Sequence, residues 1–191
     1  MKKLVVLASG SGSNFQSIIN SVESGEIRAE IAGLVVNKKT AGAVDRAESH
    51  NIPNRFIPAD DPHLFARKLD SQLDEWDPDL IILAGFLKKI PDNIVQKYSG
   101  KIINIHPALL PKYGGKGFYG EYVHKAVLKS GDSQSGCTVH FVNEKYDDGD
   151  IIAQKKVFVH SDDTAETLAK RVLKEEHKLL PAVIKQLLNQ K

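Results

Sequence analysis

The sequence predicts an α/β fold: a Rossmann-like, open, mostly parallel sheet with helices on both faces. Short apolar runs alternate along the chain with segments of helical spacing, which is the pattern of repeated strand–helix units. One run, Leu80–Leu83, is apolar at every position, as expected for a central strand that is covered on both faces. The chain has 191 residues, enough for one domain with a sizeable core, so we expect residues 1–191 to form a single domain.

Six strands are expected from the apolar runs, and two long helices from apolar residues spaced three and four positions apart. The strands are Lys3–Ala8, Ile31–Val36, Leu80–Leu83, Ile102–Ile105, Thr138–Val142 and Ile151–Val159. The helices cover Leu64–Trp76 and Thr164–Leu188. The pair Asp163-Thr164 offers a cap for the second helix, and Pro181 is expected to kink or split it. A long loop is expected over Pro107–Gly120, at the carboxyl edge where open α/β sheets bind ligands.

The composition is that of an ordinary soluble protein, with a net charge of +2 and no basic face that indicates a nucleic-acid partner. The single cysteine, Cys137, lies in an apolar run and is expected to be buried and inert. The apolar run after Lys2-Lys3 is shorter than the ~7–15 residues of a signal peptide. No stretch approaches the ~18 apolar residues of a membrane span. We therefore expect a cytoplasmic protein with no membrane partner.

The first motif, Ser9-Gly10-Ser11-Gly12-Ser13-Asn14, lies between the first expected strand and a helix. Glycines let backbone N–H groups approach an anion, and a helix N-terminus adds favourable partial charge. The motif favours a bound phosphate, with a simple strand-to-helix turn as the alternative. It is not a dinucleotide fingerprint, because Phe15 occupies the third glycine position and Asn37-Lys38-Lys39 stands where an NAD enzyme places an acid.

The second motif, Asn104-Ile105-His106-Pro107, ends the fourth expected strand. Residues two apart in a strand point to the same face, so Asn104 and His106 present an amide and an imidazole side by side. An amide can donate to a developing oxyanion, and an imidazole can act as an acid or base near neutral pH. Taken alone, a histidine at a strand end is more often structural.

The third motif is the acidic turn Asp147-Asp148-Gly149-Asp150 after the Thr138–Val142 strand. Such sequences usually form only a turn, but a carboxylate from this one can also orient His106 and stabilise its charge. The acids and histidines lack the spacing of an EF-hand loop or of a zinc site. We therefore expect no metal.

In this order, the three motifs resemble the phosphoribosylglycinamide formyltransferase family. The matching segments are Ser9–Gln16, Leu83–Phe86, Asn104–Tyr113, Gly136–Val142 and Asp147-x-Gly149. The Asn-x-His-Pro segment is shared by several formyl-handling enzymes, whereas the opening Ser-Gly-Ser-Gly-Ser-Asn and the short chain narrow the match. The resemblance implies the formyltransferase fold, with residues 1–191 as one formyltransferase domain.

The resemblance implies transfer of the formyl group of 10-formyltetrahydrofolate to the amine of glycinamide ribonucleotide, in purine synthesis. The attack would be direct and pass through a tetrahedral intermediate, with the folate as co-substrate and no metal. By similarity, Asn104 donates to the oxyanion, His106 is the general acid, and Asp147 orients His106 and raises its pKa. His140, on the neighbouring strand, is a candidate to support the site, with packing in the core as the alternative.

The resemblance also implies the binding residues. The phosphate and ribose of the acceptor would lie on Gly12, Ser13, Asn14 and Glu176. The folate would lie, largely on backbone groups, against Leu87, Lys88, Lys89, Ile90, Asn143, Glu144, Lys145 and Tyr146. The chain departs from the family pattern at Pro62, Lys88 and Leu173, where a basic residue, an Arg and a polar residue are common. It also departs in the glycine-rich loop Gly114–Gly120.

Other functions are weighed against this one. Another formyl-folate enzyme, such as a hydrolase or a methionyl-tRNA formyltransferase, is expected to carry a further N- or C-terminal domain. An NADP-dependent oxidoreductase would use the Gly10/Gly12 turn, with Lys38-Lys39 for the 2′-phosphate, but the third glycine is missing. A non-catalytic nucleotide-binding module would leave Asn104, His106 and Asp147 without a role.

Overall fold

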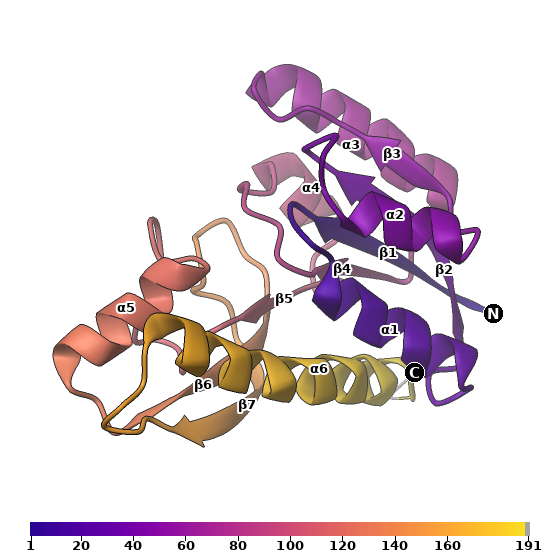
Figure 1. Ribbon diagram of the computed structural model, residues 1–191. Coiled ribbons are helices and arrows are strands. Elements are labelled where there is room, and N and C mark those ends of the chain that lie inside the picture. Colours follow the sequence, from indigo (N-terminus) through magenta and orange to yellow (C-terminus); the bar gives the residue numbers. More distant parts are fainter. Residues whose placement is uncertain (190–191) are drawn as a thin grey trace.

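The protein is described by a computed structural model that covers residues 1–189. These residues form a seven-stranded sheet flanked by helices (Figure 1). The strands are β1 (Lys2–Ala8), β2 (Ala29–Val36), β3 (Asn54–Phe56), β4 (Leu80–Leu83), β5 (Ile102–His106), β6 (Gln134–Phe141) and β7 (Ile151–Phe158). The helices are α1 (Ser13–Glu23), α2 (Ala43–Ser49), α3 (Pro62–Trp76), α4 (Asp92–Lys97), α5 (Glu121–Ser130) and α6 (Ala165–Asn189).

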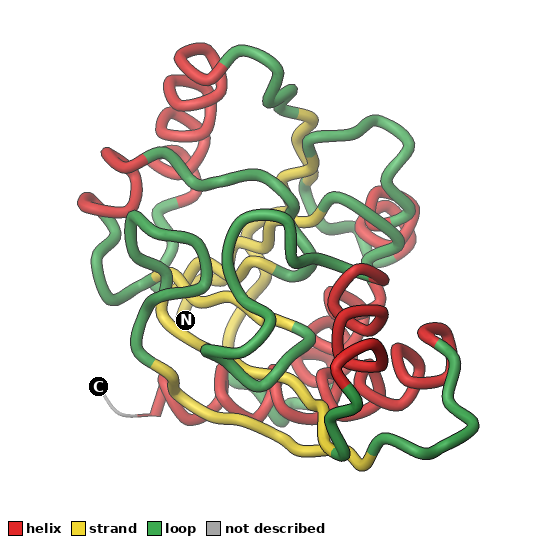
Figure 2. The backbone as a smooth tube through the Cα atoms, turned by 90° about the vertical axis from the view of Figure 1, so that its left-hand side faces the viewer, coloured by secondary structure: helices red, strands yellow, loops and turns green. Residues whose placement is uncertain are grey.

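The sheet is mostly parallel, as expected. Its strand order is β3-β2-β1-β4-β5-β6-β7, and β6 alone runs opposite to the other strands, so its pairings with β5 and β7 are antiparallel. After β1, the strands β2 and β3 are added on one side of the sheet, whereas β4 and the strands that follow it are added on the other side. The direction of strand order therefore reverses between β1 and β4. Ligands of doubly wound sheets bind at this crevice, outside the carboxyl ends of the strands. Figure 2 shows the long loops that gather over one end of the sheet.

Two hydrophobic cores cover the two faces of the sheet. In β1, Leu4 and Val6 belong to the core under α1, α2 and α6, whereas Val5 and Leu7 belong to the core under α3 and α4. The period-two alternation of side chains explains why the central strands are apolar at consecutive positions. The predicted fold class, with helices on both faces, is confirmed.

The six expected strands are present, but the structure adds elements that the sequence pattern did not indicate. Strand β3 has only three residues, which are partly or fully exposed, so no apolar run marks it. The helices α2, α4 and α5 have 7, 6 and 10 residues, too short for a clear periodic signal. Residues 107–120 form a loop, as expected.

Helix α3 begins at Pro62, with Asp61 as its N-cap. The Asp61 carboxylate accepts from the backbone N–H groups of His63 and Leu64 at 2.9 and 3.0 Å. Pro62 is the first helical residue, a position where its missing N–H costs nothing. The departure at Pro62 therefore has a local structural reason.

Helix α6 is capped by Thr164. Thr167 donates its N–H to Thr164 Oγ1 at 3.2 Å, and Thr164 donates its N–H to Thr167 Oγ1 at 2.9 Å. Asp163 instead forms an ion pair with Arg171 at 2.6 Å. Of the kink or split predicted at Pro181, the split is wrong: α6 continues through this buried proline. Its packing against α1, α5, β6 and β7 compensates for the backbone hydrogen bond that proline removes.

Cys137 is fully buried, and burial raises the pKa of its thiol to about 12, which agrees with an inert side chain. Within residues 1–189, the helices are all too short or too polar to cross a lipid bilayer.

Candidate active site

A cavity of about 790 Å³ opens at the carboxyl ends of β1, β4 and β5. Its walls come from the turn after β1, the segment after β4, the loop over residues 115–120, the loop after β6, and the helices α5 and α6. The two regions that the sequence marked for a ligand, the turn at 9–14 and the loop at 107–120, therefore meet at one cavity.

The start of α1 forms one end of the cavity. Gly12 precedes the helix with φ at 74°, and no side chain caps the helix. The first turn is closed by a bond from Gln16 N to Gly12 O at 2.9 Å, so the earlier N–H groups have no intrahelical acceptor. A Cβ on Gly12 would lie 2.8 Å from Ala43 Cα, so only glycine fits. Such an N-terminus favours the binding of an anion.

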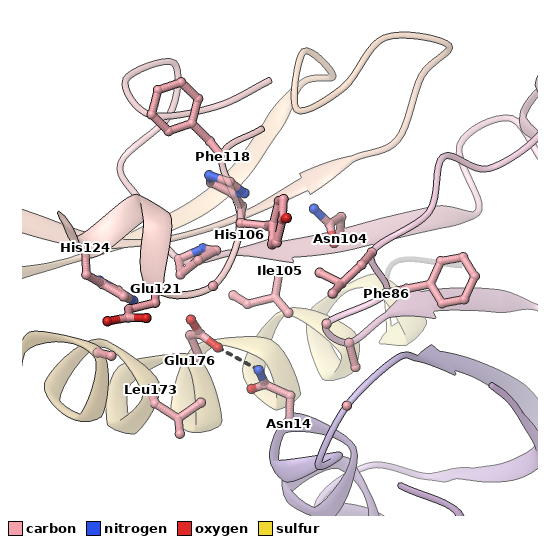
Figure 3. A pocket seen from close by; sticks show the side chains of 18 of the residues that line it. Asn14, Phe86, Asn104, Ile105, His106, Phe118, Glu121, His124, Leu173 and Glu176 are labelled. Atoms are coloured by element: carbon pink, nitrogen blue, oxygen red, sulfur yellow. Dashed lines mark hydrogen bonds between the residues drawn. The ribbon is translucent and has the colours of Figure 1, made fainter. Parts of the chain in front are cut away.

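Asn14 and Glu176 join α1 to α6 beside this helix end (Figure 3). Asn14 Nδ2 donates to Glu176 Oε2 at 2.6 Å, and both side chains are buried. Burial raises the pKa of the Glu176 carboxyl, and the hydrogen bond from Asn14 lowers it by less. A carboxyl that holds its proton can donate as well as accept, which suits hydroxyl groups as partners.

The opposite end of the cavity is lined by Asn104 and His106 of β5, and Asn104 contacts His140 of β6. Asn104 and His140 face each other in the antiparallel ladder, and Asn104 Nδ2 lies 3.1 Å from His140 Nε2. His140 Nδ1 donates to the Phe141 carbonyl at 2.7 Å, so Nε2 is free to accept from the amide. His140 is only 2% exposed. This geometry favours the role of a residue that orients Asn104.

Asp147 joins the cluster from the loop after β6. Its Oδ1 lies 3.4 Å from Asn104 Nδ2 and 3.6 Å from His140 Nε2, and its Oδ2 lies 3.5 Å from His106 Nδ1. The backbone N–H of Gly115 donates to the same Oδ2 at 3.0 Å. The structure thus brings together the three side chains for which the sequence predicted catalytic roles.

The ionisation of His106 differs from the expectation. Burial lowers the pKa of His106, while Asp147 and the Tyr113 carbonyl raise it and His140 lowers it, so the net shift is downward. Asp147 acts in the expected direction, and burial outweighs it because the imidazole is only 4% exposed. Burial raises the pKa of Asp147, but His140 and His106 lower it by more, so this carboxylate stays charged.

His124, on α5, is a cavity residue that sequence reasoning missed. It is 4% exposed, and among the described residues no group lies within hydrogen-bonding reach of its Nδ1. Burial, followed by the nearby His106, lowers the pKa of His124 to about 4. The spacing of Val123 and Val127, one helical turn apart, is the weak sequence signal that could have indicated α5 and this side chain.

Of the expected folate residues, some line the cavity and others do not. Leu87 and Tyr146 line the cavity, but Lys88, Lys89, Asn143, Glu144 and Lys145 do not. The Ile90 side chain is 4% exposed and belongs to the core under α3 and α4. The N–H of Leu87 donates to Ser9 Oγ at 2.9 Å, which ties together the turns after β1 and β4. Contacts of these two segments with a folate stay a prediction.

Comparison with known proteins places the chain in a family. Residues 2–184 match the model of the formyl transferase family. A chloroplastic phosphoribosylglycinamide formyltransferase from Arabidopsis thaliana is 48% identical over 187 residues, covering 96% of this chain and 64% of the relative. The chain spans 61% of a second chloroplastic relative, from Vigna unguiculata. A phosphoribosylglycinamide formyltransferase from Bacillus subtilis is 42% identical over 191 residues, covering 98% of this chain and 95% of the relative.

Solved structures agree with this assignment. The phosphoribosylglycinamide formyltransferase from Bacillus halodurans superimposes with a TM-score of 0.91 at 33% identity, covering 98% of this chain and 95% of that one. A formyltetrahydrofolate deformylase from Pseudomonas syringae has the same TM-score of 0.91 at 24% identity, covering 99% of this chain and 62% of that one, so it shares the fold alone. The chain belongs to the formyl transferase family, within the group of the phosphoribosylglycinamide formyltransferases.

Proposed function

We propose that the protein transfers the formyl group of 10-formyltetrahydrofolate to the amine of glycinamide ribonucleotide, a step of purine synthesis. One observation carries this proposal: Asn104, His106 and Asp147 converge at one end of a cavity whose other end is an uncapped helix N-terminus. The first end supplies the groups that acyl transfer needs, and the second suits the phosphate of the acceptor. The names of the relatives from Bacillus subtilis and Bacillus halodurans, each covered to 95% of its length, support the same reaction.

The proposed chemistry follows from the cluster. The acceptor amine attacks the formyl carbon, and the new C–N bond leaves a tetrahedral oxyanion that accepts from Asn104 Nδ2 and from His106 in its protonated form, which Asp147 and the Tyr113 carbonyl favour against the effect of burial. The bond to the folate nitrogen then breaks, and this nitrogen takes the proton of His106. The proton lost by the attacking amine passes by way of Asp147 and restores His106, so the transfer is balanced. No covalent bond to the enzyme forms.

The proposed acceptor site uses the start of α1. The phosphate would accept from the free N–H groups at Gly12, Ser13 and Asn14, and the ribose hydroxyls would bond to Glu176. Glu176 is suited to this because its raised pKa favours a carboxyl that both donates and accepts.

The proposed folate site lies between the Leu87–Ile90 and Asn143–Tyr146 segments, with Leu87 and Tyr146 as its contacts to the cavity. Both substrates are small molecules, and we propose no nucleic-acid or membrane partner. No metal takes part in this mechanism. A cytoplasmic location stays a prediction, since the plant relatives are named as chloroplastic.

A formyl-transfer assay tests the proposal. The purified protein is mixed with glycinamide ribonucleotide and a 10-formyl folate, and the deformylated folate is followed by its absorbance. Turnover that depends on the acceptor is the expected result. Release of formate without the acceptor would indicate a deformylase instead. A folded protein that does neither but binds NADPH would favour the oxidoreductase, and each of these two results would overturn the proposal.

A further inference from the structure

The backbone carbonyl of Tyr113 contacts the imidazole of His106 on the side away from Asp147. His106 Nε2 donates to this carbonyl at 2.8 Å, while His106 Nδ1 faces Asp147 Oδ2 at 3.5 Å. A carbonyl can only accept, so the Nε2 proton stays in place and Nδ1 is the nitrogen whose proton can be transferred. The direction of one carbonyl group thus decides which nitrogen of His106 serves the reaction.

This carbonyl is held in an uncommon backbone conformation. Tyr113 has φ at 56°, the left-handed region that side chains other than glycine rarely adopt. Such a conformation persists only where the surroundings determine it. The residue lies in the long loop between β5 and α5, so no strand or helix ladder fixes it. Its side chain, however, bonds to groups outside the loop, at the end of α5.

The Tyr113 side chain has a well-defined anchor. Its phenol donates to Asp132 Oδ2 at 2.8 Å and also contacts Ser130 Oγ, at the end of α5. Lys112 forms an ion pair with the same Asp132 carboxylate at 3.1 Å. The ring packs edge-on against Phe118, a cavity residue, with centroids 6.2 Å apart. The anchor thus links the end of α5 to the carbonyl that binds His106.

We propose that Tyr113 is a positioning residue, whose phenol, held by Asp132, keeps the Tyr113 carbonyl on His106 Nε2 and leaves Nδ1 to face the reacting groups. The part that concerns catalysis rests on the proposed function, whereas the effect on the imidazole does not. Burial disfavours the charged form of His106, Asp147 and the Tyr113 carbonyl favour it, and His140 disfavours it. The carbonyl is the backbone group among them, and the Tyr113 side chain is bound by Asp132, outside the cluster.

The variant Tyr113→Phe tests this proposal in the full chain, because it keeps the ring and removes only the phenol oxygen. We expect kcat to fall about 10-fold, the cost of a slightly misplaced catalytic group, with the KM for glycinamide ribonucleotide changed less than about 2-fold. The ring nitrogens of His106, followed by ¹⁵N NMR against pH, should show a mixed tautomer and loss of the proton at lower pH. Unchanged kcat and unchanged His106 signals would overturn the proposal.

If Tyr113→Phe does not fold, a pair of variants at Asp132 tests the same anchor. Asp132→Asn keeps an acceptor oxygen for the phenol and should retain the native His106 signals, whereas Asp132→Ala should reproduce the loss. Equal behaviour of the two would overturn the proposal. Lys112→Gln is the matched control, because Lys112 Nζ also binds Asp132 Oδ2, at 3.1 Å, from a side chain that is 69% exposed, and the variant keeps both the phenol and its acceptor. The NMR readout needs no turnover, so failure of the proposed function is distinguishable from failure of the anchor.

Discussion

At one end of the cavity the groups offered to a ligand are backbone N–H groups at the start of α1, whereas at the other end they are the side chains of Asn104, His106 and Asp147. The first end depends on a helix position and on the absence of a Cβ at Gly12. The second depends on the chemical identity of side chains from β5 and the loop after β6. The proposed binding and the proposed chemistry therefore depend on different kinds of group in one cavity.

This difference leads to opposite expectations for substitutions. A backbone site tolerates the loss of a side chain but not a change of backbone conformation. A side-chain cluster tolerates neither the loss nor the discharge of its members, because each group satisfies another in a buried place. Substitutions at the two ends should consequently separate KM from kcat.

The largest effect is expected at the side-chain end. His106→Ala and Asp147→Ala should each lower kcat by at least ~10²-fold, because general acid catalysis contributes about 10²–10⁴-fold. The KM for the acceptor should change much less. Steady-state kinetics checks both values, with circular dichroism to show that each variant is folded. Near-normal kcat in a folded variant would remove the distinction between the two ends.

The next prediction concerns the effect of the buried imidazole of His124, beside the cluster, on stability. Since burial lowers its pKa from 6.5 to about 4, the unfolded chain binds this proton more readily than the folded one. The neutral His124 therefore costs the folded protein no stability above pH 6.5. As the pH falls toward 4, the free energy of unfolding decreases by up to about 3 kcal/mol. Urea unfolding of His124→Gln should show a weaker pH dependence of the free energy over this range.

The control for this prediction is His63→Gln, because His63 is exposed at the start of α3. This variant should keep the pH dependence of the parent protein. If His124→Gln and the parent protein lose the same stability between pH 6.5 and 4, His124 is not buried as a neutral imidazole.

A smaller effect is expected for the backbone end. Gly12→Ala forces a Cβ against Ala43 at a φ of 74°, so the start of α1 must shift, and the KM for the acceptor should rise about 10-fold with little change in kcat. Gly25→Ala is the matched control, since Gly25 has φ at 76° with nothing within 4 Å of a Cβ. It carries the same backbone cost away from the cavity. A KM that rises equally in both variants would show that α1 does not bind the acceptor.

The smallest effect is expected for Ser13→Ala. The variant keeps the Ser13 N–H and removes only a hydroxyl, so the KM for the acceptor should rise less than about 3-fold, with kcat affected even less. Titration with glycinamide ribonucleotide by calorimetry measures the same change directly. A loss as large as that of Gly12→Ala would mean that this end also depends on a side chain.

Much of the site was predictable because its signals are local. The period of two along β5 indicated that Asn104 and His106 share a face, and the Gly-x-Gly turn before a helix indicated the anion end. Other parts had no local signal. His124 lies on a helix of 10 residues, and β3 has only three residues, which pair with β2. The expected folate residues Lys88 and Lys145 do not line the cavity. In each of these two segments the neighbouring residue, Leu87 or Tyr146, lines it instead.

The sequence by itself determined the α/β class, the two motifs at the strand ends and the family, because these follow from periodicity and from residues that are neighbours in the chain. Only the tertiary structure decided how the groups act on one another. Asp147 reaches His106 from 41 positions along the chain, and Glu176 reaches Asn14 from 162. The net fall in the His106 pKa likewise depends on burial, which arises when distant segments pack together and exclude water.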